Sequence, residues 1–95
     1  MEFSRELRAA VLAGEITVSF RLWSRAKVRA GGRYRVGDGQ IEVDSVELVP
    51  FSSIDADDIR RAGEADLESL RQRAAHAGPI NHDTPLFRIE FHVPG

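Results

Sequence analysis

The feature that most constrains the fold is the segment from Ile16 to Leu22, in which apolar and polar residues strictly alternate. Side chains of a β-strand point alternately to its two faces, so this segment predicts a strand with one apolar and one polar face. The apolar face consists of Ile16, Val18, Phe20 and Leu22. The polar face consists of Thr17, Ser19 and Arg21, followed by Trp23. Hydroxyl, guanidinium and indole groups suit the binding of a polar, planar or anionic ligand, so this face is the first candidate for a functional site.

Length and composition indicate a small globular protein. With 95 residues, the chain is expected to form a single domain over residues 1–95. The sequence contains no cysteine, which excludes disulfides, thiolate zinc sites and cysteine nucleophiles. No apolar run approaches the roughly 20 residues that cross a bilayer, and the N-terminal segment lacks the pattern of a signal peptide. We therefore expect a cytoplasmic protein without membrane contact and without a cofactor.

Charge is distributed unevenly along the chain, although the formal net charge is only −2. Residues 21–35 contain six cations and no acid, whereas residues 37–58 contain seven acids and no base. A local basic patch favours a contact with phosphate, while the slightly acidic chain as a whole lacks the broad basic surface of proteins that bind duplexes. The alternative interpretation is that the cations only keep a loop solvated.

The remaining patterns predict an α+β domain. We expect strands over residues 16–22, 33–36, 40–51 and 86–93, and helices over residues 5–13, over residues 65–77 and, as a short segment, between Ser52 and Gly63. Within the third strand the apolar register changes near Asp44 and Ser45, which predicts a β-bulge that bends the sheet. Bending favours a small closed or nearly closed barrel, in which the last strand is expected to pair with the strand that starts at Ile16.

Over nearly its whole length the chain resembles the ASCH domains of the PUA-like superfamily. The residues that carry the resemblance are Gly14 with the strand to Arg21, the segment from Lys27 to Tyr34, the long strand to Phe51 and the closing segment from Phe87 to Phe91. The family's signature is glycine, any residue, lysine, four residues, arginine; Gly14 and Arg21 match it, and Ile16 stands at the lysine position. The resemblance implies a small PUA-like β-barrel, mixed or antiparallel, with about three short helices and a cleft beside the signature strand that is proposed to bind RNA or nucleosides.

We interpret the cleft beside the strand from Ile16 to Trp23 as the site of an RNA- or nucleotide-binding module. The candidate ligand-binding residues are Thr17, Ser19, Arg21, Trp23, Arg25, Lys27 and Arg29. Arg21 is the leading candidate, because its planar fork can bind a phosphate or a base edge bidentately and Trp23 offers a stacking surface nearby. The expected partner is RNA, another single-stranded nucleic acid or a nucleotide-like small molecule. In the alternative interpretation Arg21 pairs with Glu42, Glu47 or Glu90 on a neighbouring strand, and Trp23 is half-buried under the loop.

An enzymatic alternative follows from the resemblance, because certain small members of the family look like amidohydrolases of acylated cytidine that use the signature lysine, a nearby threonine and a glutamate. The candidate catalytic residues would then be Ser19 at the threonine position, Arg21, and Glu64 or Glu68. An isoleucine at position 16 neither donates a proton nor polarises a carbonyl, so we expect no such activity. A third interpretation, a protein-interaction domain without a ligand, predicts an exposed apolar patch in place of a polar cleft.

The histidines do not indicate a metal site or a serine nucleophile. No two of His76, His82 and His92 have the spacing that places ligands on one helix face, and the adjacent His82 and Asp83 are expected to diverge in a loop. Ser19 lies on a strand and has no histidine near it in the sequence. A hydrolase triad is therefore not expected either.

Overall fold

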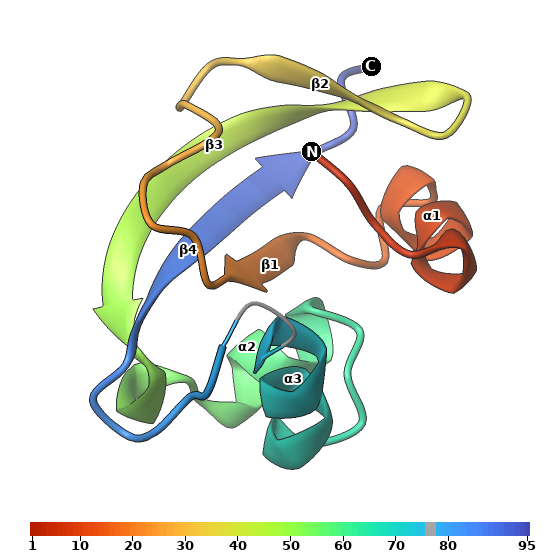
Figure 1. The fold of residues 1–95 in the computed structure, drawn as a ribbon. Coiled ribbons are helices and arrows are strands. Elements are labelled where there is room, and N and C mark those ends of the chain that lie inside the picture. The colour runs from red at the N-terminus through yellow and green to blue at the C-terminus, as the bar shows by residue number, and fades with distance from the viewer. Residues whose placement is uncertain (76–77) are drawn as a thin grey trace.

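The computed structural model describes residues 1–75 and 78–95, and it shows an α+β protein in which helices pack beside a curved sheet (Figure 1). In chain order the described elements are α1 (Arg5–Leu12), β1 (Val18–Arg21), β2 (Arg33–Val36), β3 (Gly39–Pro50), the 3-10 helix η1 (Phe51–Ser53), α2 (Ala56–Arg61), α3 (Leu67–Ala74) and β4 (Pro85–His92). This order of helices and strands is the predicted one. The end of the predicted helix over residues 65–77 lies at His76 and Ala77, outside the described residues.

The second helix lies within the predicted short segment, and the third begins at Leu67, later than the predicted start at residue 65. At α2, the backbone N–H of Asp58 donates a hydrogen bond of 2.8 Å to Oδ1 of Asp55, and the side chain of Asp58 accepts one from the backbone of Asp55 in return. At α3, the backbone N–H of Ser69 donates to Oδ1 of Asp66 at 2.8 Å. These carboxylates satisfy N–H groups that have no partner within the helix, so each helix starts directly after its capping aspartate.

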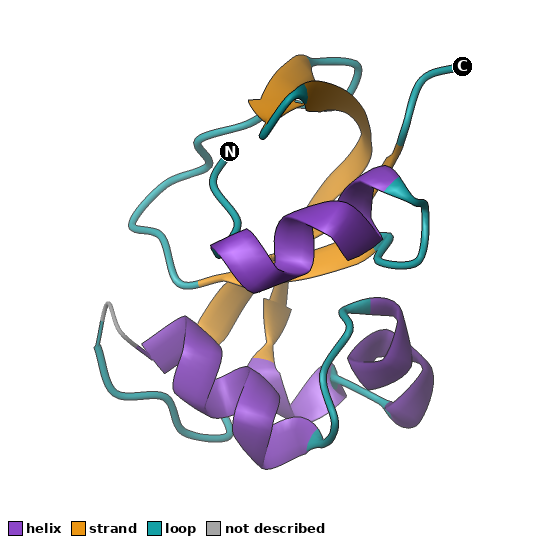
Figure 2. Ribbon diagram, turned by 90° about the vertical axis from the view of Figure 1, so that its right-hand side faces the viewer, coloured by secondary structure: helices purple, strands orange, loops and turns teal. Residues whose placement is uncertain are grey.

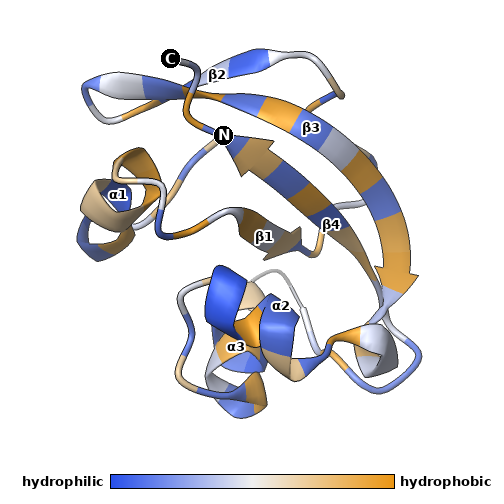
Figure 3. Ribbon diagram, turned by 180° about the vertical axis from the view of Figure 1, so that it is seen from behind, coloured by the Kyte–Doolittle hydropathy of each residue, from blue (hydrophilic) through white to orange (hydrophobic). Residues whose placement is uncertain are grey.

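The four described strands form one antiparallel sheet in the order β1-β4-β3-β2. The predicted pairing of the last strand with the strand after Ile16 is confirmed, as is the predicted bulge, since the register between β3 and β4 shifts between Val43 and Ser45. Figure 1 shows β3 as a long arc, and Figure 3 shows hydrophilic and hydrophobic residues alternating along it. The sheet is strongly bent but open, which leaves β1 and β2 as edge strands.

Buried apolar residues form two clusters. The first includes residues of α1 and of β2, β3 and β4, and it consists of Phe3, Val11, Ile16, Val28, Val36, Ile41, Val43, Ile89 and Phe91. The second lies against α2 and α3 and consists of Val18, Phe20, Phe51, Ile54, Ala62, Leu70, Ala74, Ile80 and Leu86. The predicted apolar face of the first strand is therefore divided, because Ile16 packs in one cluster and Val18 and Phe20 pack in the other. None of the helices within the described residues has the length and apolar character needed to cross a lipid bilayer.

Candidate functional site

A cleft of about 710 Å³ borders the edge strand β1. The first wall of the cleft consists of the N-terminal segment and Leu7 of α1, and the second wall consists of Glu64 and residues of α3. Figure 2 shows α1 above α3. Consecutive residues of β1, with side chains on both faces of the strand, line the cleft between these walls. The volume is in the range of small-molecule sites, which is about 300–1,000 Å³. The cleft is therefore large enough for one nucleotide.

Arg21 lies in this cleft with neutral hydrogen-bond partners. Its Nε donates to Oγ of Ser19 at 2.8 Å and its Nη2 donates to the backbone carbonyl of Glu2 at 2.5 Å. None of the ion pairs among residues 1–75 and 78–95 includes Arg21, so the predicted alternative of a pairing with Glu42, Glu47 or Glu90 is not what the structure shows. Burial lowers the pKa of Arg21, while the charge of Glu2 raises it, and a guanidinium stays protonated at neutral pH in any case.

The aromatic side chains of the site include Phe3, whose ring centre lies 4.9 Å from the guanidinium carbon of Arg21, and Trp23, which lies near two cations. The guanidinium carbon of Arg21 lies 5.9 Å from the centre of the indole, and Nζ of Lys27 lies 5.8 Å from it. Trp23 also packs on the first apolar cluster and contacts the ring of Phe87 at a centroid distance of 6.1 Å. The indole is thus half-buried, as the alternative interpretation predicts, and it still lines the cleft.

Ser19 is a buried residue of β1 that lines the cleft. Its hydroxyl oxygen accepts the hydrogen bond from Arg21, which leaves the hydroxyl proton to donate elsewhere. The two histidines that the structure describes are remote from it: His82 lies in the loop before β4 and His92 bonds Asp44. Within the described residues Ser19 therefore has no histidine to activate it as a nucleophile.

Glu64 and Arg73 form the second wall. Nε of Arg73 donates to Oε2 of Glu64 at 2.6 Å, and the side chain of Glu64 is only 7% exposed. Arg73 also contacts Oγ of Ser4 at 3.2 Å and the carboxylate of Glu6 at 3.6 Å, so it ties α3 to the N-terminal wall. A carboxylate on one side of the cleft and the guanidinium of Arg21 on β1 give the site both signs of charge.

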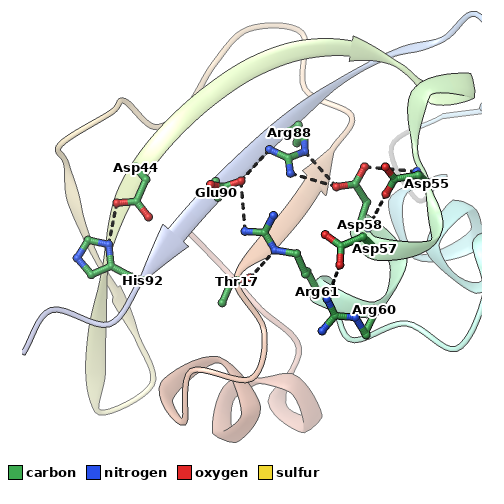
Figure 4. A network of polar contacts seen from close by, with 10 residues as sticks. All are labelled: Thr17, Asp44, Asp55, Asp57, Asp58, Arg60, Arg61, Arg88, Glu90 and His92. Carbon is green, nitrogen blue, oxygen red and sulfur yellow. Dashed lines mark hydrogen bonds and ion pairs between the residues drawn. The ribbon is translucent and has the colours of Figure 1, made fainter.

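Thr17 does not line the cleft, although the alternation predicts that it shares a face with Ser19 and Arg21. Its hydroxyl accepts a hydrogen bond of 3.0 Å from Nε of Arg61, which also pairs with Glu90 at 3.2 Å (Figure 4). Glu90 in turn bonds Arg88 at 3.0 Å, and Arg88 bonds Asp58 of α2. Thr17 therefore belongs to a polar network that joins β4 to α2.

The other predicted residues are divided between the cleft and the surface. Lys27 lines the cleft, whereas Arg25 and Arg29 are exposed and do not. Of the two candidate acids, Glu64 lines the cleft and Glu68 lies on the surface of α3, where it pairs with Arg71. The structure thus brings together Ser19, Arg21, Trp23, Lys27 and Glu64.

Several cleft residues have no signal in the sequence that identifies them. The N-terminal wall is formed by Glu2, Phe3 and Ser4, which precede the first helix and belong to no recognisable motif. Arg73 follows Leu70 at helical spacing and could be assigned to the inner face of α3 on that ground alone. Ile16, which stands at the lysine position of the signature, is only 4% exposed and packs in the first cluster.

Comparisons with known proteins show a shared fold. No protein-family model matches the sequence, and no curated protein matches it significantly. An ASCH domain from Lactobacillus crispatus superimposes with a TM-score of 0.72 and 21% identity, over 93% of this chain and 70% of that one. A protein from Enterococcus faecalis, of the family DUF984, superimposes with a TM-score of 0.69 and 15% identity, over 94% of this chain and 67% of that one. At sequence identities of 21% and 15%, these comparisons show a shared fold and nothing further.

Proposed function

We propose that this chain, which has the fold of an ASCH domain, binds one nucleotide unit in the cleft beside β1, either free or as part of single-stranded RNA. The fold supports the proposal in general terms, because the PUA-like architecture implied by the resemblance is one in which RNA binding is common. The residues of the cleft support it in particular.

The observation that carries the proposal is that the guanidinium of Arg21 has free hydrogen-bond donors and no carboxylate partner among the described residues. Two of its five N–H donors have partners, a hydroxyl and a backbone carbonyl, so three remain for a ligand. The guanidinium of Arg21 is partly buried and has no carboxylate among its hydrogen-bond partners, which favours the approach of an anion, and arginine binds phosphate bidentately. A phosphate at Arg21 would therefore supply the anionic hydrogen-bond partner that the guanidinium lacks among the described residues.

The surroundings of Arg21 favour a nucleotide over a simple anion. Trp23 presents an aromatic surface beside it, and base stacking on such a surface contributes about 1–3 kcal/mol. Lys27 adds a second positive charge above the same ring. A phosphate at the cations and a base near the indole would use the polar and the aromatic parts of the cleft together.

Replacing Arg21 with alanine tests this proposal against replacing Arg5, an exposed residue at the start of α1. Both variants lose one positive charge, and only Arg21→Ala loses a cleft residue. We expect Arg21→Ala to weaken binding of a nucleoside monophosphate or a short RNA by at least about tenfold, and Arg5→Ala to have little effect. Arg21→Lys should give an intermediate affinity, because it keeps the charge without the fork. Equal effects at positions 21 and 5 would contradict a defined site.

A second candidate function is the hydrolysis of acylated cytidines, and one observation favours it: Ser19, Arg21 and Glu64 line the same cleft. The position that corresponds to the signature lysine holds the buried Ile16, which has no group that polarises a carbonyl. We therefore expect no turnover of an N4-acylated cytidine above the uncatalysed rate. Measurable hydrolysis that disappears in Glu64→Gln would establish the enzymatic function instead.

A further inference from the structure

Glu64 presents an unused acceptor to the cleft. Its Oε2 accepts a hydrogen bond from Arg73, and its Oε1 accepts none from the described residues. None of the fully buried side-chain oxygens and nitrogens that the structure describes lacks a partner, so Oε1 is not completely enclosed by the protein. Since Glu64 lines the cleft, a ligand can reach this oxygen.

The position of Glu64 is fixed by more than one contact. Arg73 holds its carboxylate at 2.6 Å and is itself held by Ser4 and Glu6 from the opposite wall. The side chain is 7% exposed, so its rotamers are restricted before a ligand arrives. A carboxylate held in this way can select between ligands, because it does not move to suit a ligand with the wrong pattern of donors.

We propose that Glu64 reads the base of the bound nucleotide and selects guanine. This inference rests on the proposed function, since it assigns the second wall of the same cleft to the base while Arg21 binds the phosphate. A carboxylate accepts hydrogen bonds and donates none, and its two oxygens together offer about four lone pairs.

Guanine is the base whose edge fits a carboxylate best. Its N1–H and 2-amino groups are adjacent donors, so both can bond the two oxygens of Glu64 at once. Cytosine and adenine each place an acceptor nitrogen next to their amino group, and uracil places a carbonyl on each side of its only donor. These acceptors would be repelled by the carboxylate, which predicts the weakest binding for uracil.

Titrations of the natural protein with GMP, IMP, AMP, CMP and UMP test this proposal, and Trp23, the only tryptophan in the sequence, provides the fluorescence signal. IMP is the critical ligand, because it differs from GMP only in lacking the 2-amino group. We expect GMP to bind roughly tenfold more tightly than IMP, which is typical of a lost base-edge contact. A uridine hexamer with one guanosine, compared with the same hexamer carrying inosine, tests RNA as the source of the nucleotide.

Glu64→Gln should remove the preference for GMP over IMP, and Glu68→Gln is its matched control. Both variants lose one carboxylate that pairs with an arginine of α3, and only Glu64 lines the cleft. Thermal unfolding of both variants shows whether they fold, and the comparison of GMP with IMP on the unmodified protein decides the question if they do not. Equal affinity for GMP and IMP, with binding still weakened at least about tenfold in Arg21→Ala, would overturn the proposed selection of guanine and leave the proposed function standing. Absence of binding by any nucleotide or hexamer would overturn both.

Discussion

The Nε atom of Arg21 donates a hydrogen bond of 2.8 Å to Oγ of Ser19, two residues earlier on β1. The backbone carbonyl of Glu2 accepts a second hydrogen bond from the same guanidinium, donated by Nη2. These two hydrogen bonds fix the guanidinium of Arg21 through its Nε and Nη2 atoms. The orientation of the main cation in the cleft is thus determined by one strand and by the N-terminal segment.

Ser19→Ala should weaken nucleotide binding by roughly fivefold, less than Arg21→Ala. The reason is that Arg21 keeps its charge in this variant and loses only the hydrogen bond that orients its guanidinium. A typical hydrogen bond contributes about 1 kcal/mol. Calorimetric titration with GMP measures the effect. Ser24→Ala is the control, because Ser24 lines the cleft and has no contact with Arg21 among the described hydrogen bonds. Unchanged affinity in Ser19→Ala would show that the serine does not position the arginine.

Salt should weaken the binding of RNA in proportion to the number of phosphates that the cleft neutralises. Arg21 and Lys27 are the cleft cations without an ion pair among the described residues, so one or two phosphates are neutralised and the slope of log K against log[salt] should lie between about −0.7 and −1.4 for a single strand. In Arg21→Ala the slope should become shallower by about 0.7. Fluorescence titration of a hexamer at several salt concentrations measures both slopes. An unchanged slope in the variant would place the phosphate elsewhere.

Gly63→Ala should destabilise the fold more than Gly14→Ala does. Both glycines have positive φ angles, 75° and 81°, so both variants acquire the strain of a left-handed alanine, about 1 kcal/mol. A Cβ atom at position 63 would also lie 2.6 Å from Cδ1 of the buried Ile16, whereas one at position 14 would meet no atom within 4 Å. Overpacking adds about 1–3 kcal/mol. Urea unfolding measures the difference, and equal losses for the two variants would contradict the packing of Ile16 against Gly63.

Acid should destabilise the protein in part through Glu90. Burial alone would raise the pKa of Glu90, but hydrogen bonds from Arg88 and Arg61 and their positive charges outweigh it, so the pKa lies below its ordinary value of 4.5. The ionised carboxylate therefore stabilises the fold above pH 4.5, and this contribution is lost as the pH falls through the lower pKa of the folded state. Glu90→Gln should reduce the loss of stability between about pH 7 and about pH 3, measured by urea unfolding.

Glu47→Gln is the control for Glu90. Glu47 lies on β3, opposite Arg88 in the register, and is exposed without an ion pair among the described residues. The stability of the Glu47→Gln variant should therefore depend on pH in the same way as that of the unmodified protein. A pH dependence in Glu90→Gln as steep as in the unmodified protein would show that this network does not contribute to acid sensitivity.

Much of the fold follows from local patterns in the sequence. Alternation identified the first strand, and the change of register near Asp44 predicted the bulge because a shift by one residue moves every side chain to the other face. The expected pairing of the first and last strands and the ASCH-type fold are both confirmed. In the candidate site, Ser19, Arg21, Trp23, Lys27 and Glu64 were named from the sequence and line one cleft.

The remainder of the site depends on contacts that local patterns do not encode. Alternation places Thr17 on the face of Arg21, but a hydrogen bond from Arg61, 44 residues later, places it in another network. Arg25 and Arg29 lie in a loop, where spacing does not determine the direction of a side chain. The wall formed by Glu2 and Ser4 depends on contacts between residues far apart in the sequence, namely the bond from Arg21 to the carbonyl of Glu2 and the bond from Arg73 of α3 to Ser4.

The most direct measurement of the central claim is a nitrogen-15 NMR titration with a nucleoside monophosphate, observing the side-chain Nε–H of Arg21 and the indole N–H of Trp23. These two signals report on the cation and the ring that lie 5.9 Å apart in the cleft. We predict that both shift together and saturate at the same ligand concentration, while the Nε–H signal of Arg5 stays in place. Shifts confined to residues outside the cleft, or no saturable shift at Arg21 and Trp23, would contradict the account.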